Sequence, residues 1–251
     1  MNHTSITTNL ASHIQRAHNL TSLHHPYVLG EMNSIAKQGR NGETNVFGDA
    51  LWLVDFSLWA AEHNIRRLHF HQGTDYRYGS WQPVPKSTRD GGSGAASPPT
   101  TNPPYYGQVM VAKALGSSRD TRIKNIPLAG DTNAAYAVFD GDRLARLVVL
   151  NMQAFNTTSS SGGRPKKDYK FQVPASDSDN GAGTLHARVE RLTAAGSDAE
   201  TGITFGGISY DYSRQQGKPV VLDDREEIVV VEDGVLDVEL EDSSAALLTF
   251  H

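Results

Sequence analysis

Two stretches dominate this sequence, Tyr27-Val-Leu-Gly-Glu-Met-Asn-Ser34 and Leu68-His-Phe-His-Gln-Gly-Thr-Asp-Tyr76. Each is a short apolar run that ends in polar residues, which is typical of a buried strand entering a loop. Residues 45–63, between them, carry apolar side chains at helical spacing, with Leu51 and Leu58 two turns apart. The three segments predict a strand, a helix and a second strand, and hence one βαβ unit with parallel strands.

The carboxyl ends of parallel strands share one edge, where active sites gather. The pattern predicts Glu31 at that edge, although a structural ion pair with Arg67 is an alternative role.

His69 and His71 fall on one face of the second strand, as metal ligands could. Alternate residues of a barrel strand pack in layers, so we expect these histidines to pack and predict no metal site.

The composition argues against several classes of protein. A net charge of -5 with 20% charged residues does not suit a nucleic-acid-binding protein, which normally shows a basic face. We expect the short basic segment 164–167 to be a solvated loop. No apolar stretch approaches the roughly 20 residues that cross a bilayer. The chain has no cysteine, so disulfides, thiolate metal sites and cysteine nucleophiles are excluded.

The segments around the βαβ unit extend the α/β pattern over residues 1–122. Residues 9–19 predict a short helix with Ser12 as a possible cap. A loop rich in Gly, Ser, Pro and Thr follows at 74–104, and residues 105–115 predict a helix that stops at Gly116. Two parallel strands leave most of their edges uncovered, so we interpret this part as the last two units of a (β/α)8 barrel whose earlier units precede residue 1.

The periodicity changes from helical to alternating near residue 126, and residues 123–251 predict an antiparallel β-sandwich. Two strands flank a hairpin signal at Asp140-Gly-Asp-Arg143. Further strands are predicted at 169–173, 185–192, 220–222, 228–231, 235–241 and 245–250, the last one central because it is apolar throughout. The alternative is a compact α+β domain in which the βαβ unit pairs with this sheet.

Several motifs together carry a resemblance to a known family. They are Gly30-Glu-Met-Asn-Ser34, Gln38-Gly-Arg-Asn-Gly42, Phe47-Gly-Asp-Ala-Leu-Trp52 with Asp55, His69-Phe-His-Gln-Gly-Thr-Asp-Tyr-Arg-Tyr78 and Trp81-Gln-Pro83. Through them the chain resembles the fungal β-glucuronidases of glycoside hydrolase family 79, relatives of heparanase, over nearly its whole length. The resemblance implies a (β/α)8 barrel with a β-sandwich. It also implies retaining, exo-acting hydrolysis of β-linked glucuronic or 4-O-methylglucuronic acid, without cofactor or metal.

The resemblance assigns roles to a few residues. Glu31 matches the catalytic nucleophile. Tyr76 matches a tyrosine that contacts the carboxylate of the sugar, and Lys37, Gln38 and Gly39 match a loop whose backbone N–H groups hold the same carboxylate. The family commonly has an aromatic residue in this loop and this chain does not, so only the backbone role carries over.

Tyr78 and Trp81 are further candidates for substrate contact, with packing as the alternative role for each. The family's acid/base glutamate follows an asparagine at the end of barrel strand four and has no counterpart here. We expect Asp75 to brace its loop, and Glu43 and Asp49 to favour the start of a helix through its dipole.

We therefore expect a β-glucuronidase fragment that is inactive alone; the alternative is a non-catalytic remnant whose β-sandwich binds carbohydrate or is purely structural. The expected partners are a carbohydrate with terminal glucuronic acid and the missing half of the barrel, with no nucleic acid and no membrane. The start, residues 1–6, is polar and predicts no signal peptide in this chain. A full-length parent is expected to be secreted.

Overall fold

A computed structural model of the chain describes residues 1–85, 98–173 and 185–251, so part of the predicted loop 74–104 lies outside the described residues. The α/β part contains α1 (His3–Asn19), a 3-10 turn (Thr21–Leu23), β1 (Tyr27–Met32), α2 (Phe47–Glu62), β2 (Ile65–Phe70), β3 (Trp81–Gln82), β4 (Thr100–Thr101) and α3 (Pro104–Leu115). The β-rich part contains β5 (Thr121–Ile126), β6 (Asn133–Asp140), β7 (Arg143–Asn151), β8 (Lys166–Gln172), β9 (His186–Thr193), β10 (Thr204–Phe205), β11 (Ile208–Ser209), α4 (Tyr212–Gln215), β12 (Val220–Val221), β13 (Glu227–Val230), β14 (Val235–Glu241) and β15 (Ser244–Phe250).

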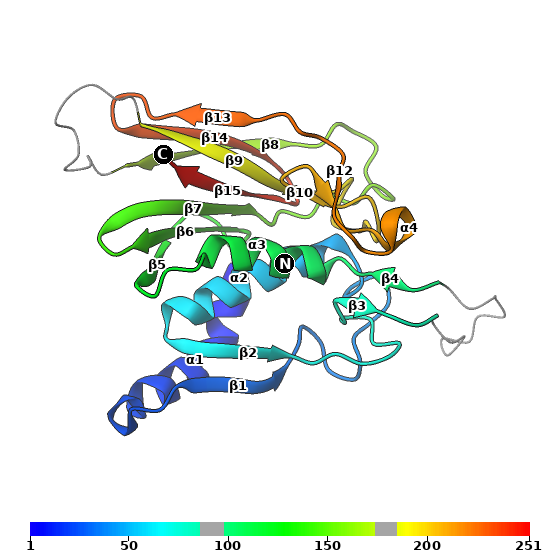
Figure 1. The fold of residues 1–251 in the computed structure, drawn as a ribbon, viewed down its shortest axis with the longest axis horizontal. Helices are drawn as coiled ribbons and strands as arrows, with labels where there is room; N and C mark the ends of the chain where they lie inside the picture. Colours follow the sequence, from blue (N-terminus) through cyan, green and yellow to red (C-terminus); the bar gives the residue numbers. More distant parts are fainter. Residues whose placement is uncertain (86–97, 174–184) are drawn as a thin grey trace.

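The predicted βαβ unit is present, because β1 and β2 pair in parallel with α2 between them in the sequence. Leu29 lies opposite Leu68, and Met32 lies opposite Phe70 at the carboxyl ends of the two strands. Figure 1 shows α2 between this small sheet and the large sheet of the β-rich part. The helix is buried around most of its circumference, which explains why its apolar residues are not confined to one stripe.

The β-rich part is an antiparallel sandwich with unequal layers. Its large sheet has nine strands in the order β12-β11-β10-β9-β15-β7-β6-β5, with β13 added on β9. The predicted central strand is confirmed, because β15 lies between β7 and β9. The opposing layer is the pair β8 and β14. The core between the layers includes Tyr169, Phe171, Leu236, Val238 and Leu240 from the smaller layer.

Helices α2 and α3 cover the other face of the large sheet (Figure 1). Tyr136 and Leu247 from the sheet share one core with Phe47 and Met110 from the helices, and all four are buried. Gly107 of α3 allows the two helices to approach closely, because a Cβ atom there would lie 2.6 Å from the carbonyl oxygen of Ala50. The division into domains at residues 122 and 123 stays a prediction, and β5 runs across that boundary.

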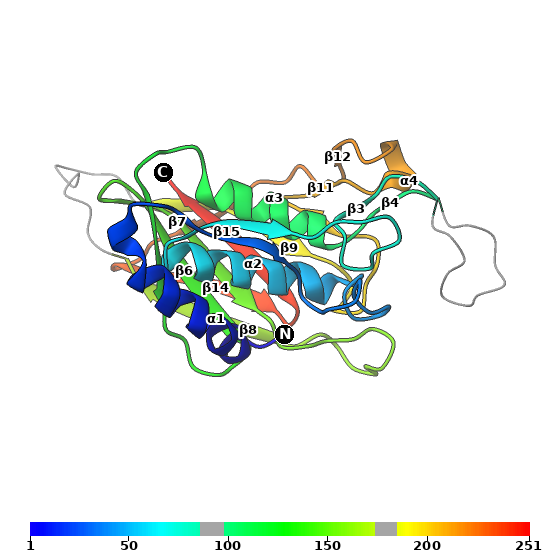
Figure 2. The same cartoon turned by 90° about the horizontal axis from the view of Figure 1, so that it is seen from below.

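Helix α1 begins earlier than predicted, at His3, and Ser12 lies inside it. Asn2 is the N-cap, since its side chain accepts a hydrogen bond from the backbone N–H of Ser5 at 2.8 Å. Figure 2 shows α1 beside α2. His3 Nδ1 lies 3.0 Å from the carboxylate of Asp55 in α2, which also accepts a hydrogen bond from Tyr136. These contacts fix the start of α1 to α2 and to the large sheet.

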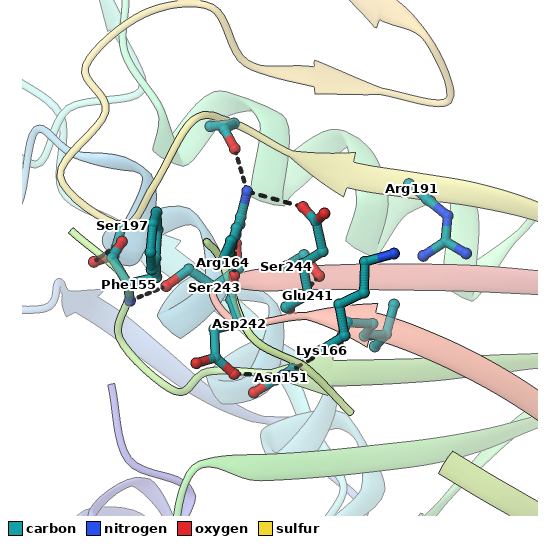
Figure 3. Close-up of polar contacts among 12 residues, drawn as sticks. Asn151, Phe155, Arg164, Lys166, Arg191, Ser197, Glu241, Asp242, Ser243 and Ser244 are labelled. Carbon is teal, nitrogen blue, oxygen red and sulfur yellow. Dashed lines mark hydrogen bonds and ion pairs between the residues drawn. The ribbon is translucent and has the colours of Figure 1, made fainter. Parts of the chain in front are cut away.

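The basic segment 164–167 is only partly the solvated loop that the composition predicts, because residues 165–167 are exposed but Arg164 is not. The half-buried Arg164 side chain lies among three chain segments in Figure 3. It donates to the carbonyl oxygens of Ala194 (2.7 Å), Asp242 and Ser243 (both 2.5 Å). Residues from Lys166 onward form β8. Carbonyl groups from separate loops converge on the Arg164 side chain. Periodicity in the sequence does not reveal such a contact, so Arg164 could not be predicted to be half-buried.

Candidate active site

The candidate site lies where β1 and β2 end. Glu31 is the penultimate residue of β1, and His71 directly follows β2. The backbone N–H of His71 donates to the carbonyl oxygen of Met32 at 2.9 Å. The side chain of Asn33 donates to the carbonyl oxygen of His71 at 3.0 Å. These bonds join the two strand ends and bring Glu31 to the edge that the sequence predicts.

The carboxylate of Glu31 faces His71, with Oε1 3.9 Å from Nε2 of the imidazole. The structure pairs Glu31 with His71 and not with Arg67, the alternative partner that the sequence suggests. The side chains of Glu31 and His71 are 75% and 35% exposed, so the interaction is weak and leaves the carboxylate accessible for chemistry.

His71 connects Glu31 to two tyrosines. Its Nδ1 lies 3.1 Å from the hydroxyl of Tyr78, and its ring stacks on Tyr76 with centroids 5.1 Å apart. Tyr76 and Tyr78 meet edge to face at 5.8 Å. Burial raises the pKa of Tyr78 above its usual range, and the nearby charges of Tyr76 and Glu31 raise it further. The phenol of Tyr78 therefore remains a hydrogen-bond donor at neutral pH.

The loop Lys37, Gln38 and Gly39 packs against the same tyrosine segment. All three residues have left-handed backbone conformations, with φ angles of 60°, 71° and 78°. The carbonyl oxygen of Gln38 accepts a hydrogen bond from the N–H of Arg77 at 2.8 Å. A Cβ atom at Gly39 would collide with the Thr44 side chain and touch Tyr78. Left-handed backbone is costly for Lys and Gln, and such conformations cluster at ligand-binding sites.

Trp81 has different neighbours from the other predicted site residues. It pairs with Thr101 across β3 and β4, and its ring lies 5.7 Å from that of Tyr212 in α4. These contacts join the loop after β2 to the β-rich part. They favour the packing alternative for Trp81 over stacking on a substrate.

The other acidic residues of this region lie in loops or in the first turn of α2. Asp75 braces its loop as predicted, because its Oδ1 accepts a hydrogen bond from Nε2 of Gln82 at 3.3 Å, and its backbone N–H donates to Oε1 of the same residue at 2.9 Å. Glu43 pairs with Arg40 at 3.1 Å. Asp49 lies in the first turn of α2, but burial raises its pKa to about 8. Burial favours the neutral form of this carboxyl and so opposes the predicted interaction with the helix dipole, which stays a prediction.

The sequence did not predict the role of His71 as the link between Glu31 and Tyr78. The available signal was its position directly after a strand, seven residues before a tyrosine. Within the described ranges, no three histidine or acidic side chains are grouped as metal ligands would be. None of the described helices is long and apolar enough to span a membrane.

The chain is similar to known proteins in sequence and in fold. Residues 135–247 match the glycosyl hydrolase family 79 C-terminal beta domain. A β-glucuronidase of Aspergillus niger is 45% identical to the chain over 263 residues, which cover 99% of the chain and 46% of that protein. The chain is therefore similar to members of glycoside hydrolase family 79 over nearly all of its length.

Other members and structures extend the comparison. A β-glucuronidase of Neurospora crassa is 36% identical to the chain over 88% of the chain and 43% of its own length. The chain spans about half the length of the curated relatives it matches. A crystal structure of a 4-O-α-L-rhamnosyl-β-D-glucuronidase from Fusarium oxysporum has the same fold, with a TM-score of 0.79 and 23% identity over 98% of the chain and 48% of that protein.

Proposed function

We propose that this chain supplies the nucleophile side of a retaining, exo-acting β-glucuronidase. The observation that carries the proposal is Glu31 at the joined ends of β1 and β2, 3.9 Å from His71 and next to the Tyr76 and Tyr78 cluster. Identity of 45% to a protein named β-glucuronidase supports the substrate class, a carbohydrate with a terminal glucuronic acid. The relatives are fungal glycoside hydrolases, and we infer that the parent protein acts outside the cell.

In the proposed reaction, a carboxylate oxygen of Glu31 attacks the anomeric carbon of the glucuronide. The bond to the leaving oxygen breaks, and a glycosyl ester of Glu31 forms. Water then attacks the same carbon, the ester bond breaks, and the configuration is retained after two inversions. Such a mechanism uses a second carboxylate, roughly 5 Å from the first, to protonate the leaving oxygen and then deprotonate the water.

The sugar carboxylate is proposed to lie against the tyrosine cluster and the loop 37–39. Tyr78 donates from a phenol that stays protonated, and His71 positions its hydroxyl. Tyr76 contributes a second phenol, and the backbone N–H groups of the loop contribute neutral donors. Hydrogen bonds to a charged acceptor are the strong kind, so this arrangement distinguishes a uronic acid from a neutral hexose.

Substrates with different leaving groups test this proposal on the chain itself. The chain lacks the acid and is expected to be inactive on leaving groups that need a proton. Dinitrophenolate departs without one, so we expect the chain to release it slowly from 2,4-dinitrophenyl β-glucuronide. Methanol needs protonation, and we expect no hydrolysis of methyl β-glucuronide. Glu31→Gln should abolish the release, whereas Glu43→Gln, in an exposed ion pair, should retain it. Equal release by wild type and Glu31→Gln would overturn the assignment.

The 75% exposure of the Glu31 side chain favours a second candidate, a non-catalytic remnant. Retaining glycosidases hold the nucleophile within a closed site, where electrostatic interactions are stronger than in water. The remnant would show no dinitrophenolate release above background while remaining folded by circular dichroism.

A further inference from the structure

Three Asn-x-Ser/Thr triplets occur in the chain, at Asn2, Asn19 and Asn156, and each has the form that accepts an N-linked glycan. Asn2 is half-buried, and its side-chain oxygen caps α1. Asn156 is exposed, but its side-chain oxygen accepts a hydrogen bond from Ser197, and the hydroxyl groups of the two threonines that follow it donate to Asp198. Both of these triplets are therefore held by contacts with other parts of the fold.

Asn19 has open surroundings. It is the last residue of α1, and residues 18–26 are all exposed. Its side-chain oxygen accepts a hydrogen bond from Nε2 of Gln15 at 2.8 Å, which is a contact between two exposed side chains. A glycan is attached through the amide nitrogen, so this contact of the oxygen can persist. A bulky glycan therefore has room at Asn19 without displacing a packed side chain.

Two large apolar side chains beside Asn19 are open to water. Leu20 is 45% exposed and Leu23 is 57% exposed. The N–H of Leu23 donates to the carbonyl oxygen of Leu20 at 3.0 Å, which closes the 3-10 turn Thr21–Leu23. Side chains three residues apart in such a turn lie on the same side of it. The two leucines thus form one small apolar surface next to the amide of Asn19.

We propose that Asn19 carries an N-linked glycan whose first N-acetylglucosamine units cover Leu20 and Leu23. The C–H faces and acetyl methyl groups of these sugars are apolar, and their contact removes the leucines from water. The amide nitrogen of Asn19 forms a bond to the anomeric carbon of a lipid-pyrophosphate-linked oligosaccharide. The bond from that carbon to the pyrophosphate breaks, the lipid pyrophosphate leaves, and the nitrogen loses one proton to solvent. This donor serves exported chains, so the proposal rests on the proposed location of the parent protein outside the cell.

A glycan at Asn19 leaves the candidate active site open. Asn19 precedes the start of β1, whereas Glu31 lies near the end of that strand. The strand spans about 13 Å from Tyr27 to Glu31 at the usual rise per residue. In Figure 1, β1 runs from the end of α1 towards the side where β3 and β4 lie. The glycan and a bound glucuronide would therefore lie at opposite ends of the βαβ unit.

Secretion of the 251-residue chain by a yeast tests the modification, with the chain recovered from both the medium and the microsomes. Peptide N-glycosidase in heavy-oxygen water converts an occupied asparagine into labelled aspartate, which peptide mass spectrometry locates. We expect label at Asn19. Thr21→Ala, which destroys the triplet, should lose this label, and Thr21→Ser, which keeps the triplet, should retain it. Asn156→Gln is the control and should leave the label at Asn19 unchanged.

Binding of a fluorescent apolar dye tests whether the glycan covers the leucines. Thr21→Ala should bind more dye than Thr21→Ser, and replacement of both Leu20 and Leu23 by serine should abolish that difference. Unlabelled Asn19, label that persists in Thr21→Ala, or equal dye binding by the two Thr21 variants would overturn the proposal. None of these measurements requires hydrolysis, so their outcome is separate from the release of dinitrophenolate that tests Glu31.

Discussion

The guanidinium group of Arg164 joins three separate segments at one end of the sandwich (Figure 3). Besides its three carbonyl acceptors it pairs with Glu241 at 3.3 Å and lies over the ring of Phe155. A planar group with several fixed donors suits such a cluster, and lysine cannot reproduce it.

Arg164→Lys should therefore lower the free energy of unfolding by about 2–3 kcal/mol, since at least one buried carbonyl loses its donor. Urea unfolding measures the change. Arg122→Lys is the matched control, because Arg122 is exposed and pairs with the fully exposed Asp142. Equal stability of the two variants would show that the Arg164 cluster does not hold the loops.

Asp49 gives stability a pH dependence of known sign. Its folded pKa of about 8 exceeds the ordinary value of 3.8 for an aspartic acid, so between these values the folded chain holds a proton that the unfolded chain has lost. The contribution of this group to the free energy of unfolding is fully present below pH about 4. It then falls by up to about 1.4 kcal/mol per pH unit as the pH rises to about 8.

Asp49→Asn, which mimics the protonated carboxyl, should remove that fall. The variant should become progressively more stable than wild type from pH 5 to pH 8, as measured by thermal unfolding. A difference between the two proteins that stays constant across this range would contradict the protonated state of Asp49.

At the residue scale, the position of Glu31 could be predicted from the sequence, but the contacts of its neighbours could not. A carboxylate at the end of an apolar run is visible in the sequence, whereas the contact of His71 with Tyr78 depends on how a loop folds back. For the same reason the sequence left both substrate contact and packing open for Trp81, whose ring meets Tyr212 from a distant segment.

At the scale of elements, the contact of α2 with α3 depends on Gly107. Glycine in a helix is normally less stable than alanine by about 1 kcal/mol. Here an added methyl group would meet the carbonyl oxygen of Ala50. We expect Gly107→Ala to destabilise the chain by about 2–4 kcal/mol, because the two helices must separate.

Chemical unfolding of Gly107→Ala checks this expectation, and Gly162→Ala, where a Cβ atom meets nothing within 4 Å, is the control. A stabilising effect at Gly107 would mean that the helices lie further apart than described.

Prediction of the elements succeeded where the periodicity was strong. It failed for strands too short to show a period and at the start of α1. The βαβ unit, the hairpin of β6 and β7 and the alternating strand β14 follow from their patterns. Strands β10 and β11 have two residues each, too few for a period. The start of α1 was missed although Asn2, a residue type that often caps helices, stands at its N-terminus. The start of α2 was predicted close to Phe47, and carbonyl groups of a distant loop accept hydrogen bonds from its first N–H groups.

At the scale of the whole molecule, the α/β and β-rich parts share one core through α2, α3 and the large sheet. We expect them to unfold together. The three tryptophans, Trp52, Trp59 and Trp81, all lie in the α/β part, whereas most strands lie in the β-rich part. Urea transitions followed by tryptophan fluorescence and by far-ultraviolet circular dichroism should coincide. Separate midpoints would show two independent domains.

Covalent trapping tests the assignment of Glu31 most directly. In 2-deoxy-2-fluoro-β-glucuronyl fluoride, the leaving fluoride needs no proton and the second fluorine slows hydrolysis of the glycosyl ester. After incubation with the 251-residue chain and peptide mass spectrometry, we predict a glycosyl adduct on Glu31, absent from Glu31→Gln and present in Glu43→Gln. An adduct on another carboxylate, or no adduct on the folded chain, would contradict the role of Glu31 as nucleophile.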